Sequence, residues 1–538
     1  MNEELGDFTA DSRTVAISAI AIVLGALSTV LALVLLKLIE LFTNLFFFGR
    51  FDLVHRTPAE HTLGWFVVLV PVIGALIIGL MARYGSERIR GHGIPEAIEA
   101  ILLNGSRVEP RLAILKPLSA AVSIGSGGPF GAEGPIIMTG GAFGSLTAQL
   151  LHLTSAERKT LLVAGAAAGM SATFAAPAAA VLLAFELLLF EWKPRSIVPV
   201  ALASITAAIC RQYWIGPAPL FPTVTHEAFV GVRGAAFCVL GGILGGVLSA
   251  GLTASVYFFE DAFHRLPIHW MWWPAIGGVF IGLGGLLFPE ALGVGYSTIG
   301  AMLQADVTLR VLVGVLIVKW LIWSIALGSG TSGGVLAPLL MIGGALGGLE
   351  SAAFPAYGVG FWPMVSMAAT LGGTMRSPFT AILFALELTH EFNMLFPLMI
   401  AVFVSYGLTV LTMKRSILTE KVSRRGFHLS REYAIDPLEI TFVRDVMRPE
   451  YIPDDDPVDD YTLGAVMAFA DEPLRAVVYR MAEHDVTHLP VVERADHTRQ
   501  VGIVSLKDML QARLKNLTEE RHRERTLSLP FFDRTGAV

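Results

Sequence analysis

The sequence predicts an all-α polytopic membrane protein built from two structural repeats with broken, tilted helices, followed by a small α/β domain. Apolar residues make up 54% of the 538 residues, charged residues make up 16%, and the mean hydropathy is +0.63. Long apolar segments recur up to about residue 413, and one sequence pattern occurs twice within them. The chain becomes polar and charged at about residue 414, where we expect the second domain to begin.

The composition argues against several classes of function. Soluble domains are about a quarter charged on average, so the low charge does not favour a soluble enzyme. Cys210 and Cys238 are the only cysteines, which excludes a disulfide scaffold and a cysteine-based metal site. The net charge of −6 and the lack of a long basic run argue against nucleic acid as a partner. We expect no metal and no required cofactor.

The first elements follow from charge and hydropathy. Residues 1–14 are predicted to be a cytoplasmic segment, because Met1–Arg13 is acidic and polar whereas a secretory signal starts with a basic region. Residues 15–38 are long enough for a transmembrane helix, which needs about 20 residues. The membrane domain is predicted at 15–420, with repeats at about 60–215 and 232–413. Its further apolar segments are expected at 64–82, 160–190, 197–213, 232–258, 273–290, 309–326, 335–353, 378–388 and 393–413.

A basic cluster follows the last apolar segment and predicts the orientation. Cytoplasmic loops carry an excess of Lys and Arg, so the tail, residues 421–538, is predicted to be cytoplasmic and the membrane to be the plasma membrane. The cluster consists of Lys414, Arg415, Lys421, Arg424 and Arg425.

An internal repeat is visible in two places. Residues 133–145 read EGPIIMTGGAFGS and residues 336–348 read LAPLLMIGGALGG, so identical Pro, Met, Gly and Ala residues recur 203 positions apart. Further on, Pro177 precedes Glu186 by nine residues, and Pro378 precedes Glu387 by nine. Paired apolar segments broken by Gly and Pro are typical of transporters built from repeats, whose binding site lies between discontinuous helices near the midplane.

Each repeat contains a glycine-rich break that leads into a helix. Residues 125–135 read GSGGPFGAEGP and residues 328–338 read GSGTSGGVLAP. A helix N-terminus offers unpaired N–H donors and about half a positive charge, so two of them would bind a small anion without a buried Lys or Arg. The alternative is that the glycines only permit close helix packing.

Glu133 is the most informative single residue. An ionisable side chain within an apolar span indicates function by default. As a carboxylate it would occupy the position of an anion, and after protonation or rotation it would vacate it, which makes it a candidate gate. The alternative is an acid that caps its own helix.

Three motifs in this order resemble the signatures of the voltage-gated chloride channel family, which includes chloride channels and proton–chloride antiporters. They are GHGIPEA (91–97), GAEGP (131–135) and GGVLAP (333–338), and the resemblance covers roughly residues 15–425. It implies a homodimer in the lipid bilayer, two inverted halves and one pathway per subunit for chloride or a similar monovalent anion. It assigns gating to Glu133. The anion-binding positions that it implies are His92, Gly93, Ile94, Ala132, Gly134, Gly334, Val335, Leu336 and Leu418.

The sequence departs from the family at four of these positions. His92 stands where Ser is usual, and imidazole can still donate an N–H. Ala132 replaces a frequent Lys or Arg, Leu336 replaces an aromatic residue, and Leu418 replaces a Tyr of many members. These changes leave the selected anion open among chloride, nitrate and fluoride.

Proton coupling is a separate question. Antiporters that resemble this chain commonly carry a second acid, and Leu187 occupies the matching position. Glu186 and Glu191 are the candidates for a proton path. We therefore predict channel-like or weakly coupled flux, with proton-coupled antiport as the alternative and a cation-coupled solute symporter as a more distant one.

The tail resembles a CBS motif at about 441–515. The sequence GIVSLKD, residues 502–508, is its most specific part, and the resemblance implies that Ser505 and Asp508 contact an adenine nucleotide. Only one copy is visible, and CBS motifs work in pairs, so the second would come from the other subunit. Structural support of the dimer is the alternative.

Overall fold

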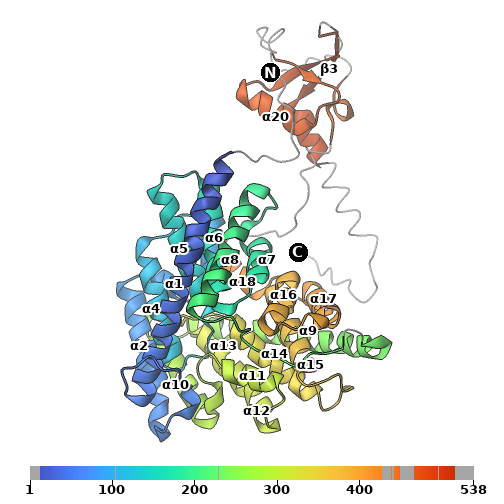
Figure 1. The fold of residues 1–538 in the computed structure, drawn as a ribbon. Coiled ribbons are helices and arrows are strands. Elements are labelled where there is room, and N and C mark those ends of the chain that lie inside the picture. Colours follow the sequence, from blue (N-terminus) through green and yellow to red (C-terminus); the bar gives the residue numbers. More distant parts are fainter. Residues whose placement is uncertain are drawn as a thin grey trace. The chain divides into compact units, whose positions relative to one another are not determined.

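The chain folds into two units, each with its own apolar core, and Figure 1 shows the helices and strands of each. The computed structural model describes residues 12–102, 104–227, 230–426, 438, 441–448, 466–494, 496–497 and 499–514. One compact unit is Met1–Ser430, which is helical, and the other is Arg431–Val538, which contains a small sheet. The predicted fold class is therefore confirmed.

The first half of the helical unit alternates long helices with short ones. Proline occupies the first turn of α4, α7 and α8, where its missing N–H costs nothing and its fixed φ suits the helix. The elements are α1 (Ser12–Phe48), α2 (Leu69–Tyr84), α3 (Ile94–Leu102), α4 (Pro110–Gly125), α5 (Glu133–Leu150), α6 (Ser155–Phe174), α7 (Pro177–Leu183), the π-helical turn η4 (Ala184–Leu189) and α8 (Pro194–Trp214).

The second half repeats this order, from a long helix matching α1 to one matching α8. One helix of the first half, α4, corresponds to a broken helix with a π-helical turn in its middle. The elements are α9 (Gly231–His264), α10 (Trp273–Leu287), α11 (Tyr296–Leu303), α12 (Leu309–Gly314), η7 (Val315–Lys319), α13 (Trp320–Gly328), α14 (Leu336–Glu350), α15 (Phe361–Met375), α16 (Pro378–Thr389), α17 (Leu395–Thr412) and then α18 (Ile417–Arg424).

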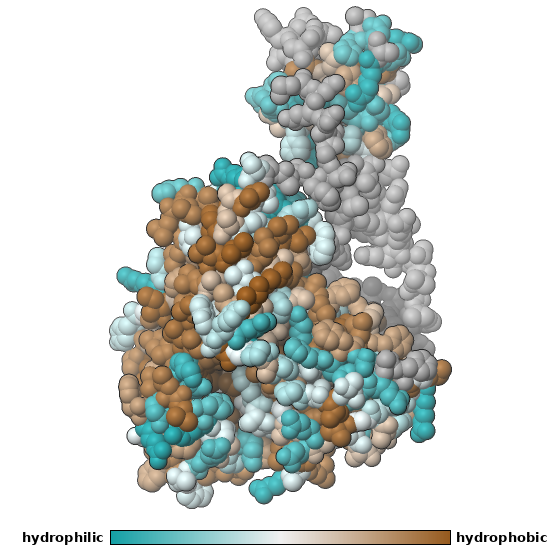
Figure 2. Space-filling view, in the orientation of Figure 1, coloured by the Kyte–Doolittle hydropathy of each residue, from teal (hydrophilic) through white to brown (hydrophobic). Residues whose placement is uncertain are grey.

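Apolar surface covers much of one face of the helical unit. Seven of the described helical segments are long and apolar enough to cross a membrane. Figure 2 shows brown, apolar surface over the face formed by α1 and its neighbours, where Val15 and Val23 are exposed. A bilayer is the environment in which such a surface is stable.

Two expectations about helices are corrected. Residues 160–190 do not form one segment, because α6 ends at Phe174 and α7 starts at Pro177. Proline disfavours helical backbone at the residue before it, and Ala175 adopts a φ of +56°. The buried helix α15 was not among the expected apolar segments, since its Ser, Thr and Gly residues lower its hydropathy.

The C-terminal unit contains a three-stranded sheet in the order β1–β2–β3. Strands β1 (Ala468–Phe469) and β2 (His488–Val492) are parallel and are connected through α20 (Leu474–Glu483), whereas β2 and β3 (Gln500–Ser505) are antiparallel. An acidic insert, PDDDPVDDYTLGAV at residues 453–466, separates the opening of the predicted CBS motif from the rest. Residues 453–465 of it lie outside the described residues.

Candidate functional site

The two glycine-rich breaks meet directly. Gly131 and Gly334, equivalent positions of the two repeats, pair with each other in an antiparallel bridge. The amide of Gly334 donates to the carbonyl of Gly131 at 2.8 Å, and the reverse bond is 3.2 Å long. Because each residue both donates to and accepts from the other, a local twofold rotation relates the two glycine-rich segments at this pair. Helices α5 and α14 both begin two residues beyond this pair, so their N-termini lie on either side of it.

The side chain of Glu133 contacts the other repeat. It is the first residue of α5 and is fully buried. Its Oε1 accepts a hydrogen bond of 2.9 Å from the amide of Ala337, in the first turn of α14, and the amide of Leu336 lies close enough to interact with the carboxylate. A negative group is thus held by the N-terminus of a helix from the opposite half, the arrangement that binds anions elsewhere.

The first motif packs against both breaks. The amide of Gly91 donates to the carbonyl of Thr331 at 3.2 Å, and the amide of Gly93 donates to the Glu96 carboxylate at 2.8 Å. A Cβ on Gly134 would lie 1.8 Å from the carbonyl oxygen of His92. Only glycine permits this approach, so all three motifs converge on one place.

The side chain of His92 is buried beside this junction. It is 3% exposed, and its Nδ1 has no hydrogen-bond partner among the described residues. The other anion-binding positions predicted in the three motifs, Ile94, Ala132, Val335 and Leu336, are fully buried. They can offer backbone amides but no polar side chain.

Leu418 enters the unit from a different element. It is buried near the start of α18, and α18 packs against α3 and α15. This places it on the side of the first motif. Its side chain can supply no hydrogen bond there.

Two buried lysines lie near the junction. The Lys116 Nζ donates to the carbonyls of Ile89 and Gly91, each at 2.8 Å. Lys319, 203 positions later, donates to Ala291 and Gly293 at 2.9 and 2.6 Å. Both are fully buried, and Lys319 interacts electrostatically with Glu133. These two lysines beside the predicted site were not anticipated from the sequence.

These lysines were missed because each stands alone in an apolar segment. Their separation of 203 residues equals the offset between the two repeats and would have identified them as equivalent positions. Their ammonium groups saturate carbonyls that would otherwise be buried without a partner, and they add positive potential next to the helix N-termini.

Glu186 and Glu387 make reciprocal contacts. The Glu186 carboxylate accepts from the amides of Phe379 and Thr380 at 3.2 and 2.7 Å. The Glu387 carboxylate accepts from those of Ala178 and Ala179 at 3.0 and 2.8 Å. Each acid therefore caps the first turn of a helix in the other half, α16 or α7.

Glu191 and Leu187 complete this region. Glu191 forms an ion pair of 2.9 Å with Lys159 and accepts a hydrogen bond of 2.8 Å from Ser196. Leu187 is fully buried and apolar. No contact among the described residues links Glu191 with Glu133.

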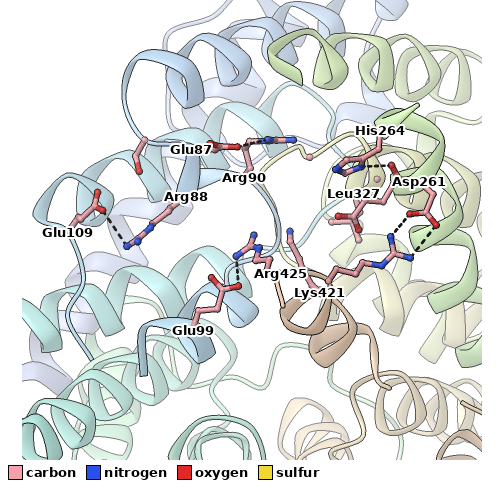
Figure 3. Close-up of a pocket in the computed structure, with 15 residues that line it drawn as sticks. Glu87, Arg88, Arg90, Glu99, Glu109, Asp261, His264, Leu327, Lys421 and Arg425 are labelled. Carbon is pink, nitrogen blue, oxygen red and sulfur yellow. Dashed lines mark hydrogen bonds and ion pairs between the residues drawn. The ribbon is translucent and has the colours of Figure 1, made fainter. Parts of the chain in front are cut away.

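A polar cavity of about 780 Å³ opens beside the first motif (Figure 3). Its acids and bases are mostly paired, as Arg88 with Glu109 at 3.3 Å and Arg425 with Glu99 at 2.5 Å. Lys421, also in the lining, lies 3.5 Å from the buried carboxylate of Glu96, which in turn holds the amide of Gly93. The cavity therefore borders the residues that support the first motif.

In the C-terminal unit, Ser505 and Asp508 contact each other. The Ser505 hydroxyl donates to Asp508 Oδ2 at 2.6 Å, and the Arg448 guanidinium donates twice to Oδ1 at 2.8 and 2.7 Å. Burial raises the pKa of Asp508, but the hydrogen bonds from Ser505 and Arg448 outweigh this effect and hold its pKa below the ordinary value. Asp508 thus has internal partners at the position where a nucleotide was expected.

Comparison with known proteins gives consistent matches. Residues 73–410 match the family described as voltage gated chloride channel, and residues 443–515 match the CBS domain. A putative chloride channel protein ClcB-like from Ralstonia nicotianae is 29% identical over 64% of this chain and 82% of its own length. The H(+)/Cl(-) exchange transporter ClcA from Citrobacter koseri is 30% identical over 72% of this chain and 84% of its own.

Solved structures share the fold. A slow cyanobacterial Cl-/H+ antiporter superposes with a TM-score of 0.67 at 23% identity and covers 78% of this chain and 99% of its own. A CLC-type fluoride/proton antiporter gives 0.63 at 20% identity, over 74% of this chain and 97% of its own.

Proposed function

The chain belongs to the voltage-gated chloride channel family, an anion-transporting family of membrane proteins. We propose that it passes chloride or a similar monovalent anion. We further propose that the flux is channel-like or weakly proton-coupled and is gated by Glu133. The observation that carries the proposal is the hydrogen bond from the Ala337 amide to Glu133 Oε1. An anion that binds this amide must displace the carboxylate, and protonation of Glu133 weakens its hold on the helix N-terminus.

The pathway follows from the elements around this contact. An anion enters the polar cavity, passes the amides at the start of α3, and reaches the paired N-termini of α5 and α14. Partial charges on amides bind an ion well enough to admit it and weakly enough to release it. The ammonium groups of Lys116 and Lys319 are shared with carbonyls, which moderates their attraction for the ion.

Weak coupling is supported by the surroundings of the candidate proton carriers. Glu186 caps a helix, Glu191 is paired with Lys159, and Leu187 carries no proton. The alternative is a proton-coupled antiporter, which is what the name of the Citrobacter koseri relative states of that protein.

The reversal potential of reconstituted vesicles distinguishes these two functions. In a chloride gradient opposed by a pH gradient, channel-like flux reverses at the chloride equilibrium potential, whereas exchange moves the reversal potential with the pH gradient. Glu133→Gln should retain flux and lose its pH dependence. Glu350→Gln, at the far end of α14, is the matched control and should behave as wild type. Unchanged pH dependence in Glu133→Gln contradicts the gate.

We also propose a homodimer in the plasma membrane with its C-terminal unit in the cytoplasm. The basic residues between Lys414 and Arg425 support this orientation. A cysteine at the exposed position Lys414 should react with an impermeant maleimide only from the cytoplasmic side, and labelling from outside intact cells contradicts this orientation.

For the CBS unit we propose structural support of the dimer, because Asp508 is engaged with Arg448. Adenine nucleotide binding is the alternative and requires Asp508 to exchange that partner for ribose hydroxyls. Calorimetric titration of the full-length protein with ATP tests it, since binding lost in Asp508→Asn favours the alternative.

A further inference from the structure

The start of α11 is the second-half equivalent of the start of α3. Gly293 and Gly295 precede α11 with φ values of +65° and +85°, as Gly91 and Gly93 precede α3 with +84° and +90°. The amide of Gly293 donates at 3.1 Å to the break before α5, just as Gly91 contacts the break before α14. The N-terminus of α11 therefore approaches the junction from the opposite half, with Tyr296 as its first residue.

Tyr296 brings a hydroxyl into apolar surroundings. Its ring packs edge-on against Phe174 and Phe221, with centroids 6.3 and 5.9 Å away, and Phe384 extends this aromatic group. The Oη atom is buried and has no hydrogen-bond partner in the described part of the chain. A buried hydroxyl without a partner is costly, so phenylalanine would be the better residue if packing were the only requirement.

Tyr296 and Glu133 lie near the same junction, since a Cβ on Gly295, the residue before Tyr296, would lie 2.4 Å from Met341 Sδ in α14. The two side chains interact electrostatically, and Glu133 Oε2 is likewise buried with no hydrogen-bond partner among the described residues. An unpaired donor and an unpaired acceptor thus adjoin the same junction.

We propose that the Tyr296 hydroxyl donates a hydrogen bond to the transported anion from the second-half side of the site. This inference rests on the proposed function, and it adds a side-chain donor to a site otherwise made of backbone amides and His92. A phenol favours anions that accept strong hydrogen bonds, so Tyr296 contributes to the selection among chloride, nitrate and fluoride.

Calorimetric titration of the purified full-length protein with sodium chloride tests the proposal. Tyr296→Phe removes the hydroxyl and keeps the ring, and it should weaken chloride binding about tenfold or more, as expected for a hydrogen bond to a charged group. Tyr357→Phe, whose ring packs against Phe361 outside the site, is the control and should bind as wild type. Tyr296→Leu provides a second variant without the hydroxyl and should weaken binding in the same direction.

The same substitution in a Glu133→Gln background separates two roles of the hydroxyl. A direct contact with the anion predicts an equal loss of affinity there, whereas loss of the effect shows that Tyr296 acts on the carboxylate and overturns the proposal. Unchanged affinity in a folded Tyr296→Phe protein also overturns it. Failure of the wild-type protein to bind or pass chloride would instead contradict the proposed function.

Discussion

At the scale of single residues, Glu133 is held by contacts that it can exchange. Among the described residues it forms no ion pair, and one carboxylate oxygen accepts a hydrogen bond from a backbone amide. Hydrogen bonds to charged groups contribute about 1.5–3 kcal/mol, an amount that a competing anion can replace. A permanent ion pair at this position would hold the carboxylate in place more firmly.

Gly134→Ala should abolish anion flux. Its Cβ would lie 1.8 Å from the carbonyl oxygen of His92, so the first motif and α5 must separate. The matched control is Gly407→Ala in α17, where a Cβ meets nothing within 4 Å and alanine should stabilise the helix by up to about 1 kcal/mol. Thermal unfolding in detergent and flux from vesicles measure both effects. Wild-type flux in Gly134→Ala would contradict the close approach of Gly134 to the His92 carbonyl.

Lys319→Met should weaken anion binding and lower the melting temperature. The change removes positive potential near Glu133 and leaves the carbonyls of Ala291 and Gly293 without their donor, at a cost of about 1–3 kcal/mol for each unsatisfied group. Lys37→Met, which removes a partly exposed pair with Glu40, should have little effect. Titration with chloride and thermal unfolding provide the readouts.

At the scale of elements, each half of the membrane unit caps a helix of the other. Glu186 and Glu387 are 201 positions apart, and each accepts two hydrogen bonds from backbone amides at the start of the opposite helix. The sequence showed both acids as members of a repeat. It could not show that each acid binds the other half, because a sequence repeat shows which positions are equivalent and does not show which residues are in contact.

Glu186→Ala and Glu387→Ala should therefore destabilise the protein by similar amounts, about 1–2 kcal/mol each, as other losses of helix caps do. Glu186→Gln keeps an acceptor oxygen and should leave the anion-to-proton ratio unchanged. The measurements are thermal unfolding and simultaneous recording of chloride efflux and proton uptake. A change in the ratio for Glu186→Gln alone would assign Glu186 to a proton path.

The helix starts that were predictable from the sequence differ in composition from those that were not. The starts of α5 and α14 were predictable because both repeats conserve the pattern of Pro, Met and Gly after the break. The equivalence of α3 and α11 was not predictable from the sequence. GHGIPEA, at the start of α3, and GVGYSTI, at the start of α11, share little beyond Gly-x-Gly. Tyr296 was not predicted as a site residue, because the residues next to it in the sequence give no indication of a site.

At the scale of the whole molecule, the membrane unit and the C-terminal unit have independent cores. The sequence indicated this division through a change in composition. The Arg448–Asp508 pair was not predictable, because it joins residues on either side of a long acidic insert. It connects the beginning and the end of the CBS unit, so we expect it to control the stability of that unit alone.

Acid should therefore unfold the C-terminal unit selectively. The pKa of Asp508 is lowered in the folded state, so its contribution to stability is complete above the ordinary pKa and is lost as the pH falls through the folded-state value. Asp508→Asn should remove this acid dependence and destabilise the unit at neutral pH, whereas Asp471→Asn, which breaks an exposed pair with Arg494, should change little. Hydrogen exchange of the β2 and β3 amides in the full-length protein, corrected for intrinsic rates, measures the acid dependence and the stability at neutral pH. Equal protection of wild type and Asp508→Asn at neutral pH would show that the pair does not stabilise the unit.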